Sequence, residues 1–331
     1  MSDRPLRFQR LPRFALDSGE ALSDVVQAYH LDGELNAERD NLVVVFHALT
    51  GSADAAEGWW SEVVGPGRAI DTGQYAVLCT NLLGSCYGTT YAGDEPGRPR
   101  PRITPRDQAR LIHALVEELG VRSVALAVGG SLGGMVAMEW AASFPTLTRA
   151  TVVLAAPAAH TAAAIGWNHL QRAAILQGGP GRGLELARMI AMMTYRTGAE
   201  FEQRFGRLRG EDGFEVASYL AHQGEKLVRR FTERSYLTLM DAMDAHDVGR
   251  GRGGTEPALR RVGGRLIGVG IPGDLLYTDV DVRAWVKLAG AEYRAIQSIH
   301  GHDAFLIELE QVSELLTDAL SSATVATPLH T

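Results

Sequence analysis

Residues 125–135 read Ala125-Leu-Ala-Val-Gly-Gly-Ser131-Leu-Gly-Gly-Met135, an apolar stretch that runs into a serine between glycines. Gly129, Ser131 and Gly133 fill the G-x-S-x-G pattern of a nucleophile elbow. Because glycine lacks a Cβ, the backbone can turn sharply there from a strand into a helix and expose the serine hydroxyl. The turn would place Ser131 at a helix N-terminus, whose dipole favours negative charge. The stretch therefore predicts a strand, a tight turn that carries a nucleophile, and a helix.

The residues on either side favour this interpretation over a chance match. Ser123 to Val128 are apolar and β-prone, and Met135 to Phe144 carry apolar residues at helical spacing. A strand before the serine and a helix after it are the context that the motif requires. The same glycines are a weak signal for nucleotide binding, because the run lacks the Lys-Ser/Thr ending of a phosphate loop.

Apolar runs elsewhere predict an α/β fold with a mostly parallel, doubly wound sheet. The predicted strands are Leu42 to Phe46, Tyr75 to Cys79, Ser123 to Val128, Ala150 to Leu154, Arg265 to Val269 and Glu292 to Ile296. Continuously apolar strands are typical of a sheet covered on both faces. Helical stretches alternate with them, and the clearest runs from Pro105 to Leu119, with Thr104 as its cap.

Residues 160–248 interrupt this alternation. They show helical periodicity, as in Leu184, Ala187, Arg188 and Ala191 and then from Tyr219 to Leu239, without a convincing strand. We expect residues 1–159 and 249–331 to form the core and residues 160–248 to form an all-helical insertion. Placed over the carboxyl end of a parallel sheet, such an insertion would act as a lid.

Composition limits the classes of function. The chain has 331 residues, 46% of them hydrophobic, and a formal net charge of −7 without a basic run, which argues against nucleic acid or an anionic membrane as the main partner. It has no apolar region typical of a signal peptide and no run long enough to span a bilayer, so we expect a cytoplasmic protein. Cys79 and Cys86 are expected to stay reduced.

An activated serine needs a base and a carboxylate, in this fold type in the chain order serine, acid, histidine. His302 follows the last predicted strand, and His300 in the same loop is a rival that the sequence separates poorly. Asp274 directly follows the strand that ends near Gly270, whereas Asp279 and Asp281 lie further into the next element. We therefore predict the trio Ser131, Asp274 and His302.

Two backbone amides are expected to bind the oxyanion of an acyl intermediate. Leu132 follows the nucleophile, and Leu49 lies in the loop after an earlier strand. His47 at the start of that loop is expected to be structural. No metal site is predicted, because the chain has no H-E-x-x-H motif and no closely spaced pair of cysteines for zinc.

Across nearly its full length the chain resembles the homoserine O-acetyltransferase family of the α/β-hydrolase superfamily. The resemblance rests on His47-Ala-Leu-Thr-Gly51; Asn81-Leu-Leu-Gly84 with Cys86; Ile103-Thr-Pro-Arg-Asp107; Gly129-Gly-Ser-Leu-Gly-Gly-Met135; Ala187-Arg-Met-Ile-Ala191 leading to Thr194-Tyr-Arg196; Gln223-Gly-Glu-Lys226; Ala242-Met-Asp244 with His246-Asp-Val-Gly249; and Gly301-His-Asp-Ala-Phe305.

The resemblance implies an α/β-hydrolase fold and transfer of an acetyl group from acetyl-CoA to the hydroxyl of L-homoserine, through an acyl-enzyme on Ser131, as a step toward methionine. It implies no permanently bound cofactor. It places the triad acid at Asp274 and the amino-acid contacts at Arg188 and Asp303, with Tyr195 as a further contact. Members of the family are typically homodimers through the helical insertion, which we expect here too.

Two stretches depart from the family pattern. Tyr87-Gly-Thr-Thr-Tyr91 stands where relatives commonly read Gly-Ser-Thr-Gly-Pro, and Ile175 to Gly183 lacks a longer tryptophan-containing segment. A succinyl donor or a serine acceptor therefore remains an alternative. Arg250 and Arg252 are candidates for contacts with the CoA phosphates, against the simpler interpretation of a solvated loop. An esterase with the same triad and a catalytically silent binding protein are the alternatives from other classes.

Overall fold

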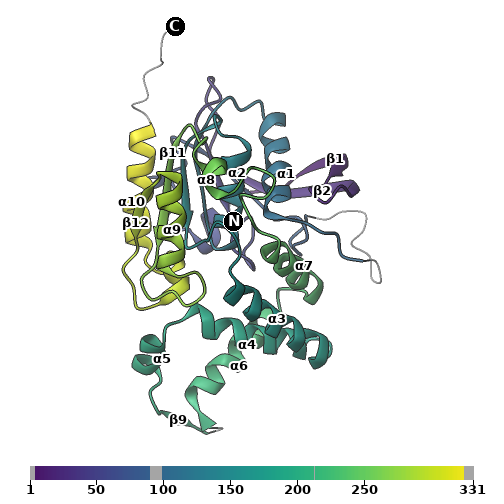
Figure 1. Cartoon of the computed structure of the whole chain (residues 1–331), viewed down its shortest axis with the longest axis vertical. Coiled ribbons are helices and arrows are strands. Elements are labelled where there is room, and N and C mark those ends of the chain that lie inside the picture. The colour runs from purple at the N-terminus through teal and green to yellow at the C-terminus, as the bar shows by residue number, and fades with distance from the viewer. Residues whose placement is uncertain (1–3, 90–98, 212, 324–331) are drawn as a thin grey trace.

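The computed structural model describes residues 4–89, 99–211 and 213–323. An eight-stranded sheet forms its centre, in the order β1-β2-β6-β3-β7-β8-β11-β12 (Figure 1). The strands are β1 (Arg7–Ala15), β2 (Ala21–Asp32), β3 (Leu42–Phe46), β6 (Ala76–Thr80), β7 (Val124–Gly130), β8 (Thr148–Leu154), β11 (Arg265–Gly270) and β12 (Glu292–Ala295). From β6 to β12 all neighbours pair in parallel, which confirms the predicted fold class.

All six predicted strands are present, with ends that differ by a few residues at most. The antiparallel hairpin of β1 and β2 was not predicted. Only Gln9 and Phe14 are buried among the nine residues of β1, and Phe8 is 54% exposed. A strand at the edge of a sheet has one neighbour and little buried surface, so its apolar pattern is weak.

Helices cover both faces of the sheet. Each face of the sheet has its own cluster of buried apolar side chains. The first cluster packs the sheet against α1 (Pro105–Glu118), α2 (Leu132–Ser143), α8 (Thr255–Leu259) and α9 (Asp279–Ala289). The second cluster packs it against α10 (Leu309–Ala323). In β3, Val44 contributes to the first cluster and Val43 to the second, as a doubly covered strand requires. Helix α1 begins after Thr104, which caps it as predicted and also forms a capping box with Asp107.

Most of the chain between β8 and β11 forms helices beyond one end of the sheet (Figure 1). They are α3 (Ala162–Gly178), α4 (Arg182–Tyr195), α5 (Gly198–Arg204), α6 (Glu215–Val228) and α7 (Glu233–Asp244). The expectation of an all-helical segment was wrong in one detail, since the two-residue strands β9 (Arg209–Gly210) and β10 (Gly213–Phe214) pair there. The periodic stretch from Tyr219 to Leu239 is two helices, because Thr232 caps a new one.

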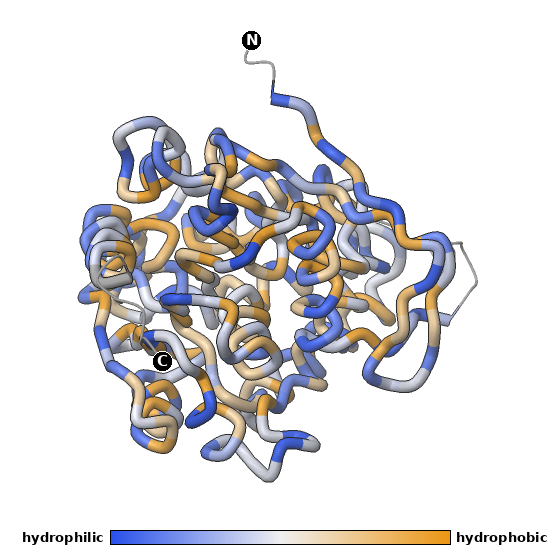
Figure 2. Tube along the Cα trace, turned by 90° about the horizontal axis from the view of Figure 1, so that it is seen from above, coloured by the Kyte–Doolittle hydropathy of each residue, from blue (hydrophilic) through white to orange (hydrophobic). Residues whose placement is uncertain are grey.

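Hydrophobic stretches run through the middle of the molecule, and hydrophilic stretches are frequent along its outer loops (Figure 2). Within the described ranges, no helix is both long and apolar enough to cross a bilayer. Cys79 is buried, Cys86 is half-buried, and neither forms a disulfide. Burial raises the pKa of the Cys79 thiol, which keeps it protonated and inert.

Candidate active site

Ser131 occupies the tight turn between β7 and α2, with φ 58° and ψ −124°. A positive φ is unfavourable for a residue with a side chain, so the surrounding structure must hold it. The serine N–H donates a hydrogen bond to the Leu154 carbonyl at 3.0 Å. A Cβ on Gly129 would lie 2.3 Å from the Gly133 oxygen, and one on Gly133 would lie 2.1 Å from the Phe46 oxygen. Both glycines of the motif are therefore required by close packing.

Asp274 and His302 are paired beside this turn. His302 Nδ1 lies 2.7 Å from Asp274 Oδ2, and the other carboxylate oxygen accepts hydrogen bonds from the amides of Leu276 and Tyr277. Burial lowers the pKa of His302, but the charge and hydrogen bond of Asp274 outweigh it, so the pKa lies above its ordinary value. The carboxylate thus fixes the ring and stabilises its protonated form.

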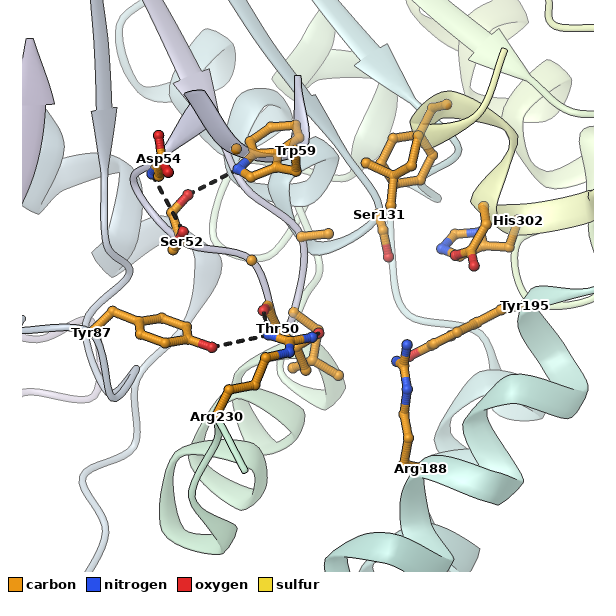
Figure 3. A pocket seen from close by; sticks show the side chains of 17 residues that line it. Thr50, Ser52, Asp54, Trp59, Tyr87, Ser131, Arg188, Tyr195, Arg230 and His302 are labelled. Atoms are coloured by element: carbon orange, nitrogen blue, oxygen red, sulfur yellow. Dashed lines mark hydrogen bonds between the residues drawn. The ribbon is translucent and has the colours of Figure 1, made fainter. Parts of the chain in front are cut away.

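The second ring nitrogen of His302, Nε2, does not contact Asp274. This Nε2 atom is buried and has no hydrogen-bond partner among the described residues. Ser131 and His302 line the same pocket (Figure 3). In unliganded enzymes the hydrogen bond between nucleophile and base is often long and tightens when substrate binds. The rings of Tyr195, Tyr277 and Phe305 pack around the imidazole and hold it in place.

The structure separates the alternatives that the sequence left open. His300 lies outside this pocket, and its Nδ1 is 3.2 Å from a Glu200 oxygen. Asp279 pairs with Arg283 at 2.6 Å, and Asp281 completes the capping box of α9. None of these three groups lies near enough to Ser131 to line its pocket.

Leu49 lines the pocket in the loop after β3, and Leu132 begins α2 directly after Ser131. Neither backbone N–H donates a hydrogen bond within the described ranges. His47 supports the loop from behind: its Nδ1 contacts the Ala48 carbonyl at 2.7 Å, and its Nε2 accepts from the Leu82 N–H. Complete burial lowers the pKa of His47 to about 4, so this ring is neutral, in keeping with a structural role.

Three further predicted residues meet in the same pocket, a cavity of about 510 Å³. Arg188 and Tyr195 come from α4, and Asp303 directly follows His302. The Arg188 guanidinium lies over the Tyr195 ring, 5.3 Å from its centroid, and forms no ion pair with any described carboxylate. Asp303 pairs with Arg196 at 3.2 Å. Arg188, without a described carboxylate partner, and the carboxylate of Asp303 therefore line the same pocket as the reacting serine.

Sequence reasoning missed Arg230, which lies just past α6 on the opposite side of the pocket with Thr50 and Tyr87 (Figure 3). Its guanidinium donates to the Thr50 carbonyl at 2.5 Å, to the Thr50 hydroxyl and to the Tyr87 hydroxyl. These partners are neutral, and no carboxylate among the described residues forms an ion pair with Arg230. The only signal in the sequence was its proximity to the Gln223-Gly-Glu-Lys226 run.

The candidates Arg250 and Arg252 do not line this pocket. Arg250 pairs with Asp17 at 2.6 Å, and Arg252 pairs with the buried Glu139 at 2.6 Å. Their charges are therefore compensated within the protein, although most of the loop from Arg250 to Gly254 is exposed to solvent. In the described part of the chain, no three His, Cys, Asp or Glu side chains are grouped as a metal site would require.

Comparison with known proteins agrees with the geometry. A family model described as "alpha/beta hydrolase fold" matches residues 41–240. The chain is 47% identical to a homoserine O-acetyltransferase of Thermus thermophilus, over 93% of this chain and 89% of that protein. The crystal structure of homoserine O-acetyltransferase from Staphylococcus aureus matches with a TM-score of 0.83 at 29% identity, over 99% of this chain and 98% of that one.

The crystal structure of esterase E22 superposes with a TM-score of 0.86 over 96% of this chain and 99% of that one, but at 19% identity. A match of shape at that identity identifies the fold alone. Identity over nearly the whole length is what distinguishes the acetyltransferases from the other proteins of this fold. The chain belongs to the homoserine O-acetyltransferase family of the α/β-hydrolase fold.

Proposed function

We propose that this protein transfers the acetyl group of acetyl-CoA to the side-chain hydroxyl of L-homoserine, through an acetyl ester on Ser131, as a step toward methionine. One observation favours an amino acid as the acceptor, and not acyl transfer in general. Arg188 and Asp303 present an uncompensated cation and a carboxylate in the pocket of the nucleophile. An α-amino acid carries the complementary pair of charges, whereas a simple ester does not.

In the first half of the reaction, His302 removes the proton of the Ser131 hydroxyl, and the serine oxygen attacks the thioester carbonyl. The amides of Leu49 and Leu132 donate to the oxyanion that forms. His302 returns the proton to the departing thiolate, so CoA leaves as the thiol and the acetyl group stays on Ser131. Asp274 keeps the ring in the tautomer that this cycle needs.

In the second half, homoserine takes the place of CoA. Arg188 binds its α-carboxylate with two N–H groups, and Asp303 accepts from its α-ammonium group. The ring of Tyr195 packs against the guanidinium in a cation–π contact and helps to orient it. With both ends of the amino acid held, its hydroxyl faces the acyl-serine, and His302 removes the hydroxyl proton as the oxygen attacks. O-acetylhomoserine leaves, and Ser131 regains its proton from His302.

The acyl-enzyme must react with an amino acid in preference to water. An oriented neighbour reaches effective molarities of about 10⁵ to 10⁸ M, far above the concentration of liquid water. We propose that residues 160–248 form a lid over the core of residues 1–159 and 249–331. Arg188, Tyr195 and Arg230 reach the pocket from this segment, so a closed lid would both bind the acceptor and limit access of water.

Arg230 is our candidate for the donor side. CoA is polyanionic, and the partners of this guanidinium among the described residues are all neutral. The acetyl donor is favoured by the names of the relatives, and a succinyl donor or a serine acceptor remains the alternative. Of the departing stretch that motivates this alternative, Thr90 and Tyr91 lie outside the described residues.

A homodimer through the helical segment fits the exposed apolar residues of α3 and α4. Ile165, Leu170 and Leu176 are 39%, 50% and 70% exposed there, and Met193 of α4 is 45% exposed. Exposed large apolar side chains such as these are available for an interface between two copies of the chain. Light scattering after size exclusion should give twice the chain mass, and Leu170→Asp should reduce it. The two free thiols suit a reducing compartment, and we place the enzyme in the cytoplasm.

The decisive experiment follows thiol release by the purified protein with acetyl-CoA or succinyl-CoA, in the presence and absence of L-homoserine or L-serine. We expect release that depends on homoserine and is fastest with acetyl-CoA, with O-acetylhomoserine as the product. Release that ignores the amino acid and yields only acetate would establish a hydrolase instead. No acylation of Ser131 by any donor would indicate a binding protein.

A further inference from the structure

Arg196 lies between two carboxylates at the junction of α4 and α5. Its guanidinium nitrogens are 3.1 Å from a Glu200 oxygen and 3.2 Å from Asp303 Oδ2. All three side chains are largely buried, with exposed fractions of 16%, 8% and 16% for Arg196, Glu200 and Asp303. A guanidinium in such a place is strongly held, because losing either partner would leave a poorly solvated charge.

Arg196, Glu200 and Asp303 together carry a net negative charge. One cation and two carboxylates sum to one negative charge, and Asp303 is the member of the three that lines the pocket. Arg196 therefore does not cancel the charge that an ammonium group would meet. It holds one oxygen of Asp303 at Oδ2, so the other oxygen can face the pocket. Without Glu200, the pair of Arg196 and Asp303 would be neutral and a poorer ammonium site.

The junction is also fastened to the loop that carries the base. The Thr197 hydroxyl donates to the Ile299 carbonyl at 2.5 Å, and His300 Nδ1 lies 3.2 Å from the same Glu200 oxygen that Arg196 contacts. Both contacts reach the loop just before His302. The position of Asp303 is thus set from α4 and α5, although Asp303 itself belongs to the core.

We propose that Arg196, braced by Glu200, is a positioning residue that orients Asp303 toward the α-ammonium group of the acceptor and so makes the enzyme select an amino acid. The inference rests on the proposed function and adds the element that determines acceptor specificity. Arg196 acts through Asp303 and touches no reacting atom. Its removal should therefore affect acceptors with an ammonium group more than acceptors without one.

The test compares L-homoserine with 4-hydroxybutyrate, which has the same hydroxyl and carboxylate but no amino group. For each acceptor, kcat/KM is measured with acetyl-CoA in the full-length wild type, Arg196→Gln, Arg196→Lys and Glu200→Gln. We expect Arg196→Gln to reduce the preference for homoserine about tenfold, and Arg196→Lys to recover part of it. Arg182→Gln is the matched control, because Arg182 lies on α4 in an exposed ion pair with Glu185.

A second measurement separates positioning from general damage to the fold. In an Asp303→Asn background, Arg196→Gln should change the preference little further, because its target is already gone. Acylation by p-nitrophenyl acetate, which needs no amino acid, should fall far less than the preference does. Melting temperatures show whether each variant is folded, and Arg196→Lys provides the test if Arg196→Gln is not.

Equal losses of kcat/KM for both acceptors would overturn the inference, as would an unchanged preference in both Arg196 variants. The wild-type result is independent of these outcomes. If the wild type transfers acetyl to homoserine and the variants keep its preference, only the inference is wrong. If the wild type does not use homoserine at all, the proposed function is wrong and the inference falls with it.

Discussion

The carboxyl ends of the sheet strands and the segment of helices α4 to α6 contribute to one pocket in different ways. Ser131, Asp274 and His302 follow the ends of β7, β11 and β12 and are almost fully buried, with the acid and the base locked at 2.7 Å. Arg188 and Arg230 come from the helical segment, are more exposed, and keep a charge that no described carboxylate compensates.

The difference indicates that the two regions have separate roles, one in catalysis and one in substrate recognition. A buried, fully paired arrangement suits proton transfer, which depends on fixed geometry and tuned pKa values. Uncompensated charges at the surface of a pocket suit ligands that supply the missing partner. We therefore expect substitutions at the carboxyl ends of the strands to affect the rate of acylation, and substitutions in the helical segment to affect substrate recognition.

The largest effect should come from Ser131→Ala, which removes the nucleophile. We expect homoserine-dependent thiol release to fall by at least about 10⁴-fold, because catalytic residues that act as a unit fail together. Mass spectrometry after mixing with acetyl-CoA should detect an acetylated wild type and an unmodified variant. A variant that still accumulates acetyl-enzyme would place the nucleophile elsewhere.

Asp274→Asn should slow the reaction by about 10³- to 10⁴-fold, because the ring loses the partner that sets its tautomer. The pH profile gives a second readout. His302 acts as a base only when neutral, and its raised pKa means that kcat/KM should fall as the pH drops through a midpoint above 6.5. Without the carboxylate of Asp274, only the charge of Asp303 opposes the effect of burial on the pKa of the ring, so the midpoint should move to lower pH. A midpoint that stays in place would contradict the pairing.

Arg188→Gln should raise the KM for homoserine by about 30-fold, the loss expected when a charged hydrogen-bonding partner is removed. Acylation of Ser131 by acetyl-CoA should continue, since Arg188 binds only the second substrate. Stopped-flow measurement of the thiol burst separates the two halves. Loss of the burst would show that the helices also serve acylation, and the division between the two regions would then be wrong.

The smallest effect should come from Arg230→Gln, with a KM for acetyl-CoA raised about five- to tenfold and more strongly at low ionic strength. The truncated thioester S-acetyl-N-acetylcysteamine lacks the phosphates, so its KM should be unchanged. Arg229→Gln is the matched control, because Arg229 is 74% exposed and pairs with Glu225. Equal effects on both donors would mean that Arg230 only braces Thr50.

Much of the structure at the carboxyl ends of the strands was predictable because it depends on local patterns. The strand before Ser131, the glycines around it and the capped helix from Pro105 all follow from short-range rules of backbone and burial. The hairpin of β1 and β2 was not predictable, because it is exposed and has little apolar periodicity. Its pairing with β6 is a contact between distant parts of the chain.

The helical segment was predictable in outline only. Arg188 was identified through the family motif. Arg196 and Glu200 are four positions apart, but no local pattern showed that Arg196 would also contact Asp303. The ion pairs of Arg250 with Asp17 and of Arg252 with Glu139 were not predicted for the same reason, since the partners of a charge are set by tertiary packing. Isolated charged residues carry no periodicity that a sequence could reveal.

By itself, the sequence determined the elbow at Ser131, the alternation of strands and helices, and the family. These depend on glycine geometry, burial and spacing along the chain. Only the tertiary structure decided that His302 and not His300 pairs with Asp274, and that Arg188 and Arg230 keep charges that no described carboxylate compensates on opposite sides of one pocket. Such choices depend on distances between side chains far apart in sequence, which the folded backbone alone fixes.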